Sequence, residues 1–168
     1  MSQQFQYDTE IKMAILTVSD TRDYHTDKGG ALVEKLASAS QIRVIERKIC
    51  RDELLEIRET LKQWANHPEV DCIITTGGTG IATRDVTIEA IQPLFNKEIP
   101  GFGELFRYLS FTEDIGTRAM ASRAVAGVVN NKVIFTLPGS TGAVKLAMEK
   151  LILTELNHLV FELKKRAK

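Results

Sequence analysis

The sequence has no excess of charge of either sign, since 22 lysine and arginine residues balance 22 aspartate and glutamate residues. It therefore gives no electrostatic basis for binding to nucleic acid or to an acidic membrane surface. No apolar run approaches the roughly 18 residues of a membrane span. The polar N-terminus lacks the charged-then-apolar order of a signal peptide. We expect a cytoplasmic protein with neither a nucleic-acid nor a membrane partner.

Cysteine and histidine are also scarce, which limits the chemistry that the chain can perform. Cys50 and Cys72 each fall within an apolar, strand-like run, so we expect two free, buried thiols. The three histidines share no motif with each other or with a cysteine. This pattern predicts neither a histidine–cysteine metal site nor a covalent nucleophile. The remaining possibility for an enzyme is chemistry by positioning and charge neutralisation, which is typical of phosphoryl and nucleotidyl transfer.

Apolar runs and amphipathic patterns alternate along the chain. They predict strands over residues 11–19, 42–50 and 72–74, and a hairpin of residues 124–129 and 132–137 around Asn130–Asn131. Helices are predicted over 27–39, 52–66, 85–94, 104–111, 114–123 and 142–164, with a turn at 99–103. We therefore predict one domain over residues 1–168, with a polar N-terminal tail at 1–10. Its fold class is α/β, a three-layer α/β/α arrangement with a mostly parallel sheet and one antiparallel strand.

The stretch after the third predicted strand is rich in glycine. It reads Thr75-Thr76-Gly77-Gly78-Thr79-Gly80, and a helical pattern begins near Asp85. Glycines at these positions let backbone N–H groups turn toward one point, which predicts an anion site. The stretch fits neither the P-loop pattern nor the dinucleotide pattern. A plain glycine-rich turn between strand and helix is the alternative.

Polar clusters follow four of the predicted strands. They are Ser19–Asp20, Arg51–Glu53, Thr75–Gly80 and Pro138–Thr141. In a parallel sheet these positions share the carboxyl edge, where ligands bind. Asp52 and Asp85 are candidate ligands for Mg²⁺ beside a phosphate, and Asp20 is a third. The alternative is that such residues only cap helices and form turns.

A combination of motifs then suggests a family. The motifs are Thr-Val-Ser-Asp (17–20), Asp52, Thr-Thr-Gly-Gly-Thr-Gly (75–80), Arg-Asp-Val-Thr (84–87), Pro-Gly-Phe-Gly-Glu (100–104), Ser-Arg-Ala-Val-Ala-Gly (122–127) and Leu-Pro-Gly-Ser (137–140). Together they resemble the molybdopterin adenylyltransferase family, and within it the B branch. The likeness runs from about residue 12 to the last helix and implies the molybdopterin-binding fold of that family.

The resemblance implies an activity: Mg²⁺-dependent transfer of AMP from ATP to the terminal phosphate of molybdopterin. It also implies roles for individual residues. Asp52 and Asp85 would be catalytic and hold the metal, and a second group would bind the nucleotide: Ser19, Asp20, Thr76, Gly77, Gly78, Thr79 and Gly80. A third group would bind the pterin: Glu104, Ser122, Pro138, Gly139 and Ser140. Many family members have Pro-Gly-Asn-Pro where this chain has Pro-Gly-Ser-Thr, so its pterin contacts are expected to differ.

The resemblance also implies partners. Family members form homotrimers, and this branch pairs two trimers into a hexamer. The adenylated product would pass to the molybdate-insertion enzyme. Two other functions stay open: a carrier that binds the pterin without chemistry, and a different nucleotide-processing enzyme, as in competence-damage-inducible proteins. The aromatic residues Phe102, Phe106, Tyr108 and Phe111 are expected in either an interface or the core.

Overall fold

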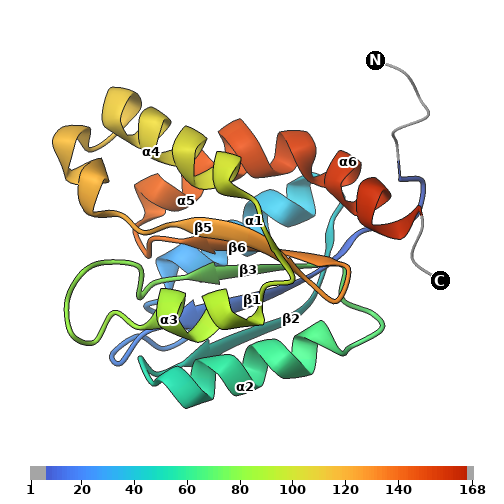
Figure 1. Ribbon diagram of the computed structural model, residues 1–168, viewed down its shortest axis with the longest axis horizontal. Coiled ribbons are helices and arrows are strands. Elements are labelled where there is room, and N and C mark those ends of the chain that lie inside the picture. Colours follow the sequence, from blue (N-terminus) through green and yellow to red (C-terminus); the bar gives the residue numbers. More distant parts are fainter. Residues whose placement is uncertain (1–6, 166–168) are drawn as a thin grey trace.

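The computed structural model describes residues 7–165, which form a six-stranded sheet between two layers of helices (Figure 1). The strands are β1 (Lys12–Val18), β2 (Arg43–Cys50), β3 (Cys72–Thr76), β4 (Lys97–Glu98), β5 (Val125–Val129) and β6 (Lys132–Leu137). Their order across the sheet is β2-β1-β3-β6-β5-β4. The three-layer α/β/α prediction is confirmed.

The helices are α1 (Lys28–Ala39), α2 (Leu54–Ala65), α3 (Thr87–Ile91), α4 (Pro100–Glu113), α5 (Thr141–Ala147) and α6 (Leu153–Lys164). Short 3-10 segments span residues 92–94 and 116–121, and a π-helical turn over 148–152 joins α5 to α6. Figure 1 shows α2 and α3 on one face of the sheet and α4, α5 and α6 on the other. Val33 and Ala37 of α1 are buried in the same cluster as side chains of α4, α5 and α6, so α1 belongs to that second layer.

Strand direction agrees with the prediction of one antiparallel strand. β2, β1, β3 and β6 pair in parallel, and β5 pairs antiparallel with both β6 and β4. β5 therefore runs opposite to the other five strands. Asn130 and Asn131 form the predicted hairpin turn with φ of 50° and 62°, a conformation that asparagine tolerates better than most residues. β4 was not predicted, because a two-residue edge strand leaves no pattern in the sequence.

The apolar residues form two clusters, one on each face of the sheet. The odd-numbered side chains of β1, such as Met13 and Ile15, pack toward α1, α4, α5 and α6. The even-numbered ones, such as Leu16, pack toward α2 and α3. Because β1, β3 and β6 are buried on both faces, they have near-continuous apolar runs, whereas the edge strand β2 mixes exposed and half-buried side chains.

Several local expectations need correction. The predicted turn at residues 99–103 is wrong beyond Ile99, because α4 begins at Pro100. Proline is well suited to a first helical position, where no N–H bond is lost. α3 begins at Thr87 rather than at Asp85. The aromatic group divides: Phe102 and Phe106 are buried, whereas Tyr108 and Phe111 are more than half exposed.

The expected state of the two cysteines is confirmed, because Cys50 and Cys72 are free and buried. Asp27 caps α1 by accepting the amide of Gly30 at 3.0 Å. Over the described part of the chain, no helix combines the length and the apolar character that crossing a bilayer requires. The first six residues of the predicted N-terminal tail lie outside the described residues.

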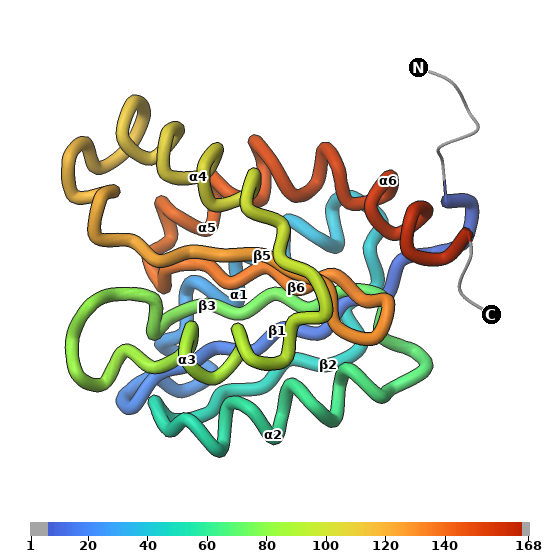
Figure 2. The backbone as a smooth tube through the Cα atoms, in the orientation of Figure 1, coloured from blue at the N-terminus to red at the C-terminus, as the bar shows by residue number. Residues whose placement is uncertain are grey.

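The two ends of the sheet face different surroundings. In Figure 2 the loop after β3, drawn in green, lies at the left, whereas the start of β1 and the end of α6 lie together at the right. The polar clusters of the sequence therefore sit at the end of the sheet that lies far from the first and last described residues.

Candidate functional site

Loops that are distant in sequence meet at the carboxyl edge of the sheet. The amide of Ser19, after β1, donates to the carbonyl of Cys50 at the end of β2 at 2.8 Å. The amide of Gly77, after β3, donates to the carbonyl of Leu137 at the end of β6 at 2.9 Å. A Cβ atom at Gly77 would collide with the carbonyl oxygen of Val18. The predicted clusters thus share one edge, as expected for the ends of parallel strands.

The glycine loop adopts a conformation that demands glycine. Gly77 has φ of 93° and Gly78 has φ of 71°. Thr87, the first residue of α3, fixes both glycines: its hydroxyl donates to the carbonyl of Gly77 at 2.8 Å, and its amide donates to that of Gly78 at 3.1 Å. Among residues 7–165, no acceptor receives the amides of Gly78, Thr79 or Gly80. The loop therefore presents free N–H groups that suit an anion.

Asp52 and Asp85 flank this loop. Asp52 Oδ1 lies 3.4 Å from the point where a Cβ of Gly78 would stand, and Asp85 Oδ2 lies 2.7 Å from the corresponding point at Gly80. Neither aspartate caps a helix, because Glu53 and Val86 hold the N-cap positions of α2 and α3. The alternative of helix capping by these two residues is therefore wrong.

The electrostatics at Asp52 favour a cation. Partial burial raises the pKa of its carboxyl group, and the negative charges of Asp20 and Asp85 raise it further. Asp85 is held by its own loop, because its Oδ2 accepts the amide of Ala82 at 3.0 Å. The two carboxylates leave a concentration of negative charge beside the free amides of the loop, which a bound divalent cation would relieve.

Asp20 and Arg84 tie the loops together across the site. Asp20 accepts the amide of Asp52 at 3.0 Å, and Arg84 Nε and Nη2 donate to its two oxygens at 3.0 and 2.9 Å. Arg84 also donates to Glu53 at 3.0 Å. These bonds lower the pKa of Asp20, first through Arg84 and then through the backbone of Asp52. Sequence reasoning missed Arg84, although it stands beside Asp85 in the quoted motif.

Three predicted residues use their hydroxyls for local structure. Ser19 Oγ accepts the amides of Thr21 and Arg22 at 3.2 and 3.1 Å. The buried hydroxyl of Thr76 donates to that of Thr17 at 3.4 Å. Ser140 caps α5 by accepting the amide of Ala143 at 3.2 Å. Their backbones stay at the carboxyl edge of the sheet.

The residues predicted to bind the pterin divide into two groups. Pro138, Gly139 and Ser140 follow β6, and Gly139 lies beside the glycine loop, with its ideal Cβ position 3.5 Å from the Cα of Gly77. Ser122 and Glu104 instead line a cavity of about 440 Å³ among α3, α4 and β5, whose lining includes no residue of the loop 75–80. The structure therefore does not bring these two groups into one cavity.

The carboxylates at the site suit a metal ion that is bound jointly by the protein and by the phosphates of a substrate. Among residues 7–165, no three histidine, cysteine, aspartate or glutamate side chains lie close enough together to form a metal site by themselves. Mg²⁺ usually keeps several waters and binds through one or two carboxylates plus substrate phosphates. Asp52 and Asp85 beside an anion-binding loop match this donor set, whereas they would not form a complete cage for a free ion.

Comparisons with known proteins identify the family. A family model described as the probable molybdopterin binding domain matches residues 14–158. Molybdenum cofactor biosynthesis protein B of Staphylococcus aureus (strain COL) is 62% identical over 157 residues, which cover 92% of this chain and 93% of that protein. This chain belongs to the molybdenum cofactor biosynthesis protein B family. A crystal structure of a protein of that name matches with a TM-score of 0.92 at 48% identity, covering 96% of this chain and all of the other.

Family membership covers nearly the whole chain, so it includes every loop at the carboxyl edge. A more distant structure, the protein CinA from Thermoplasma acidophilum, has a TM-score of 0.59 at 15% identity and covers 89% of this chain and 98% of the other. At that identity it shares the fold alone. The matches to molybdenum cofactor biosynthesis protein B confirm the resemblance to the B branch. The likeness to CinA adds nothing about activity.

Arg123 is a further residue at the site that sequence reasoning did not single out. Its guanidinium donates to the carbonyls of Gly80 and Asp85, both at 2.9 Å, and it pairs with Glu89. The only signal in the sequence was its place in the motif at residues 122–127. Arg123 also borders the cavity that Ser122 and Glu104 line, so it connects the two parts of the site.

Proposed function

We propose that this protein acts in molybdenum cofactor biosynthesis, as a Mg²⁺-dependent adenylyltransferase that transfers AMP from ATP to molybdopterin. The name of its relatives supports the pathway. One observation in the structure supports the proposed reaction. A glycine loop with unpaired amides lies between two carboxylates, those of Asp52 and Asp85. This arrangement suits a polyphosphate that brings its own magnesium ion.

In the proposed reaction an oxygen of the terminal phosphate of molybdopterin attacks the α-phosphorus of ATP. The bond between the α-phosphorus and the oxygen that bridges it to the β-phosphorus breaks, and pyrophosphate leaves with the electron pair of that bond. The amides of Gly78, Thr79 and Gly80 would hold the phosphates in line, because they are fixed and lack other acceptors. Asp52 and Asp85 would hold Mg²⁺, which supplies charge neutralisation on the phosphates.

The pterin side of the proposed site is less compact. Gly139 packs against Gly77, so a terminal phosphate that contacts Pro138, Gly139 or Ser140 would lie near the polyphosphate. Ser122 and Glu104 offer a hydroxyl and a carboxylate in the adjacent cavity of about 440 Å³. Such groups match the hydrogen-bonding edge of a pterin ring. We propose that the ring occupies this cavity or borders it.

Substituting Asp85 tests the proposal. Purified protein would be mixed with molybdopterin, ATP and Mg²⁺, and adenylated pterin measured by chromatography. Asp85→Asn should lower turnover by at least about 100-fold, because a neutral amide cannot replace a carboxylate ligand of the metal. Asp8→Asn is the matched control, since Asp8 is an exposed aspartate at the amino edge of the sheet. Undiminished turnover in Asp85→Asn would show that Asp85 is not a required ligand of the metal.

The carrier function makes a different prediction for the same mixture. It is motivated by Pro-Gly-Ser-Thr at 138–141, where many adenylyltransferases have Pro-Gly-Asn-Pro. A carrier would bind molybdopterin and form no ATP-dependent product, so a product peak in the wild type would exclude it. Binding of another nucleotide without binding of molybdopterin would favour the third function, that of a different nucleotide-processing enzyme.

We propose further that the protein associates with itself, as a homotrimer or a pair of trimers. Leu105, Tyr108 and Phe111 on α4 and Met120 after it are all more than half exposed. Apolar side chains that are exposed in a group are typical of protein interfaces. Sedimentation velocity would measure the assembly, and a monomer at micromolar concentration would contradict it. Transfer of product to a molybdate-insertion enzyme stays a prediction.

A further inference from the structure

Arg123 makes an unusual set of contacts with the glycine loop. Its backbone amide donates to the carbonyl of Thr79 at 3.1 Å. Its guanidinium donates through Nε to the carbonyl of Gly80 and through Nη2 to that of Asp85, both at 2.9 Å. One residue thus binds three carbonyl groups on both sides of the exposed segment 81–84.

These contacts determine where the neighbouring amides point. A trans peptide group is planar, and its N–H points opposite to its C=O, and the described chain has no cis peptide bond. Because Arg123 binds the carbonyls of Thr79, Gly80 and Asp85, the amides of the residues that follow each of them turn away from it. Those amides belong to Gly80, Ile81 and Val86, and none has an acceptor among residues 7–165.

Arg123 is itself well anchored. Its guanidinium forms an ion pair with Glu89 of α3, in which Nη2 lies 3.1 Å from Oε1 and Nη1 contacts Oε2. It directly precedes Ala124, which is buried, and Val125, the first residue of β5. The loop is therefore tied through one side chain to a helix and through one backbone to the sheet. The ion pair also lowers the pKa of Glu89, so the pair stays charged at neutral pH.

We propose that Arg123 is a positioning residue, which orients the peptide groups of the loop 79–86 so that their amides face a bound polyphosphate. The identity of that ligand rests on the function proposed above, whereas the orientation of the loop does not. Arg123 acts on the loop carbonyls rather than on the substrate. Its planar fork of donors suits two separate carbonyls and a carboxylate at once, and the single ammonium of lysine cannot make the same set of bonds.

The proposal is tested by comparing Arg123→Lys with Arg58→Lys. Arg58 is a close control, because its guanidinium also donates to two backbone carbonyls, those of Ala90 at 3.1 Å and Glu89 at 2.9 Å, without contacting the loop. Both variants keep the positive charge and lose comparable hydrogen bonds. Similar melting temperatures for the two would show that general stability does not separate them.

Two measurements follow on each variant and on the wild type. Amide hydrogen exchange is recorded on the free protein for Ala82, Asp85 and Thr87, whose amides are hydrogen-bonded within or to the loop, and the Kd for Mg-ATP is measured by calorimetry. We expect exchange in Arg123→Lys to be at least tenfold faster and its Kd at least tenfold higher. Arg58→Lys should stay within 1.5-fold of the wild type in both. Wild-type exchange in Arg123→Lys, or the same loss in both variants, would overturn the proposal.

A second variant covers the case in which Arg123→Lys does not fold. Glu89→Gln keeps the shape of the anchor but removes its charge, so Arg123 retains its carbonyl contacts with less restraint. We expect a smaller change in the same direction, about threefold in exchange, and no change would overturn the proposal. If the wild type fails to bind Mg-ATP, the proposed function fails, and the exchange measurement alone still decides whether Arg123 holds the loop.

Discussion

The carboxyl and amino edges of the same sheet are built in opposite ways. At the amino edge, Asp71 is buried and accepts the amide of Lys12 at 2.8 Å, while Lys164 lies 3.1 Å from its other oxygen. Lys12 also pairs with Glu69. At the carboxyl edge three aspartates gather beside glycines with positive φ, and neighbouring amides have no acceptor among the described residues. Asp71 and Glu69 at the amino edge are thus paired with lysines. At the carboxyl edge Asp20 pairs with Arg84, whereas Asp52 and Asp85 form no ion pair among the described residues, which leaves their charges for a ligand.

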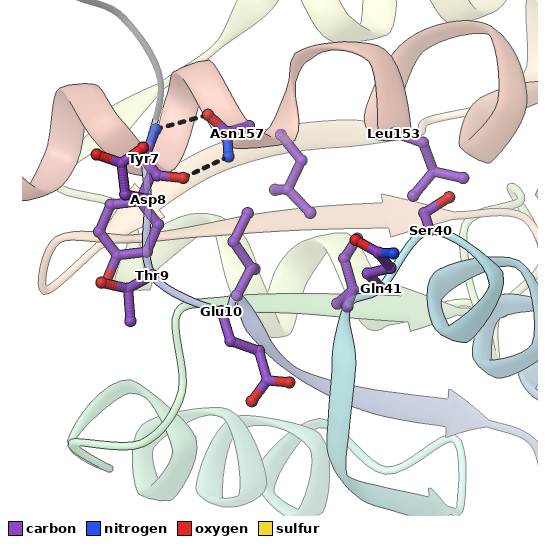
Figure 3. A pocket seen from close by; sticks show the side chains of 11 residues that line it. Tyr7, Asp8, Thr9, Glu10, Ser40, Gln41, Leu153 and Asn157 are labelled. Carbon is purple, nitrogen blue, oxygen red and sulfur yellow. Dashed lines mark hydrogen bonds between the residues drawn. The ribbon is translucent and has the colours of Figure 1, made fainter.

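The size of a cavity would not have distinguished these edges. A cavity of about 520 Å³ lies at the amino edge, larger than the one of about 440 Å³ that Ser122 and Glu104 line. Figure 3 shows Tyr7 and Asn157 in it, joined by two hydrogen bonds between the backbone of Tyr7 and the side chain of Asn157. These bonds of 2.7 and 2.9 Å fasten the start of the described chain to α6. They indicate a structural role for this cavity.

The first prediction concerns Asp71 and the paired edge. Asp71→Ala should lower the free energy of unfolding by about 2 to 3 kcal/mol, because the amide of Lys12 and the ammonium of Lys164 both lose a buried partner. Denaturant melts would measure the change. Binding of Mg-ATP should stay normal in the folded fraction, since Asp71 lies at the far edge of the sheet. A Kd that rises tenfold would show that the two edges are coupled and would break the comparison.

The second prediction concerns Gly78 and the ligand edge. Gly78→Ala should lower the free energy of unfolding by about 1 to 2 kcal/mol, because alanine is strained at φ of 71°. The added methyl would also collide with the hydroxyl of Thr87, so the loop must shift and Mg-ATP binding should weaken by at least about tenfold.

Gly101→Ala is the matched control for this substitution. Gly101 lies in the first turn of α4, and an added methyl would meet nothing within 4 Å. Alanine favours the helix there, so stability should stay equal or rise by up to about 1 kcal/mol. Equal stability loss in the two variants would mean that the conformation of the glycine loop imposes no special demand.

Much of the fold could be predicted because strands and turns depend on residues that are close together in the sequence. The runs at 11–19 and 72–74 are apolar on both faces and indicate buried parallel strands, and Asn130–Asn131 indicates a hairpin. The proline and two glycines of Ile99–Gly103 favour a turn. Yet proline suits the first turn of a helix, and Phe102 and Phe106 supply a buried face that stabilises α4. Tertiary packing outweighed the turn signal.

The candidate site could be predicted only in part. Clustered glycines and aspartates after parallel strands favour phosphate chemistry, so the sequence alone points to Asp52 and Asp85. The role of Arg123 depends on a contact between segments 43 residues apart, and no short pattern records such a contact. Ser122 and Glu104 came from the resemblance alone, and the structure shows that they line a separate cavity.

The third prediction, with the smallest change in stability, concerns Asp52. At neutral pH its charge opposes folding, because burial and the nearby Asp20 and Asp85 raise its pKa in the folded state. The folded protein therefore binds this proton more tightly than the unfolded chain, and the stability so gained at low pH is lost as the pH rises through the raised pKa. Asp52→Asn removes the charge and should raise the free energy of unfolding at pH 7 by about 0.5 kcal/mol or less, because Asp52 is only partly buried and solvent screens its charge.

Melting curves of the wild type and Asp52→Asn across pH would check this linkage. The difference between them should be largest near neutral pH and should shrink as the pH falls through the raised pKa, because the wild-type carboxyl group is then neutral as well. Product formation should fall in the variant at every pH, since the metal loses a charged ligand. Destabilisation by Asp52→Asn at pH 7 would mean that this carboxylate is paired like those of the amino edge, and the contrast between the edges would no longer hold.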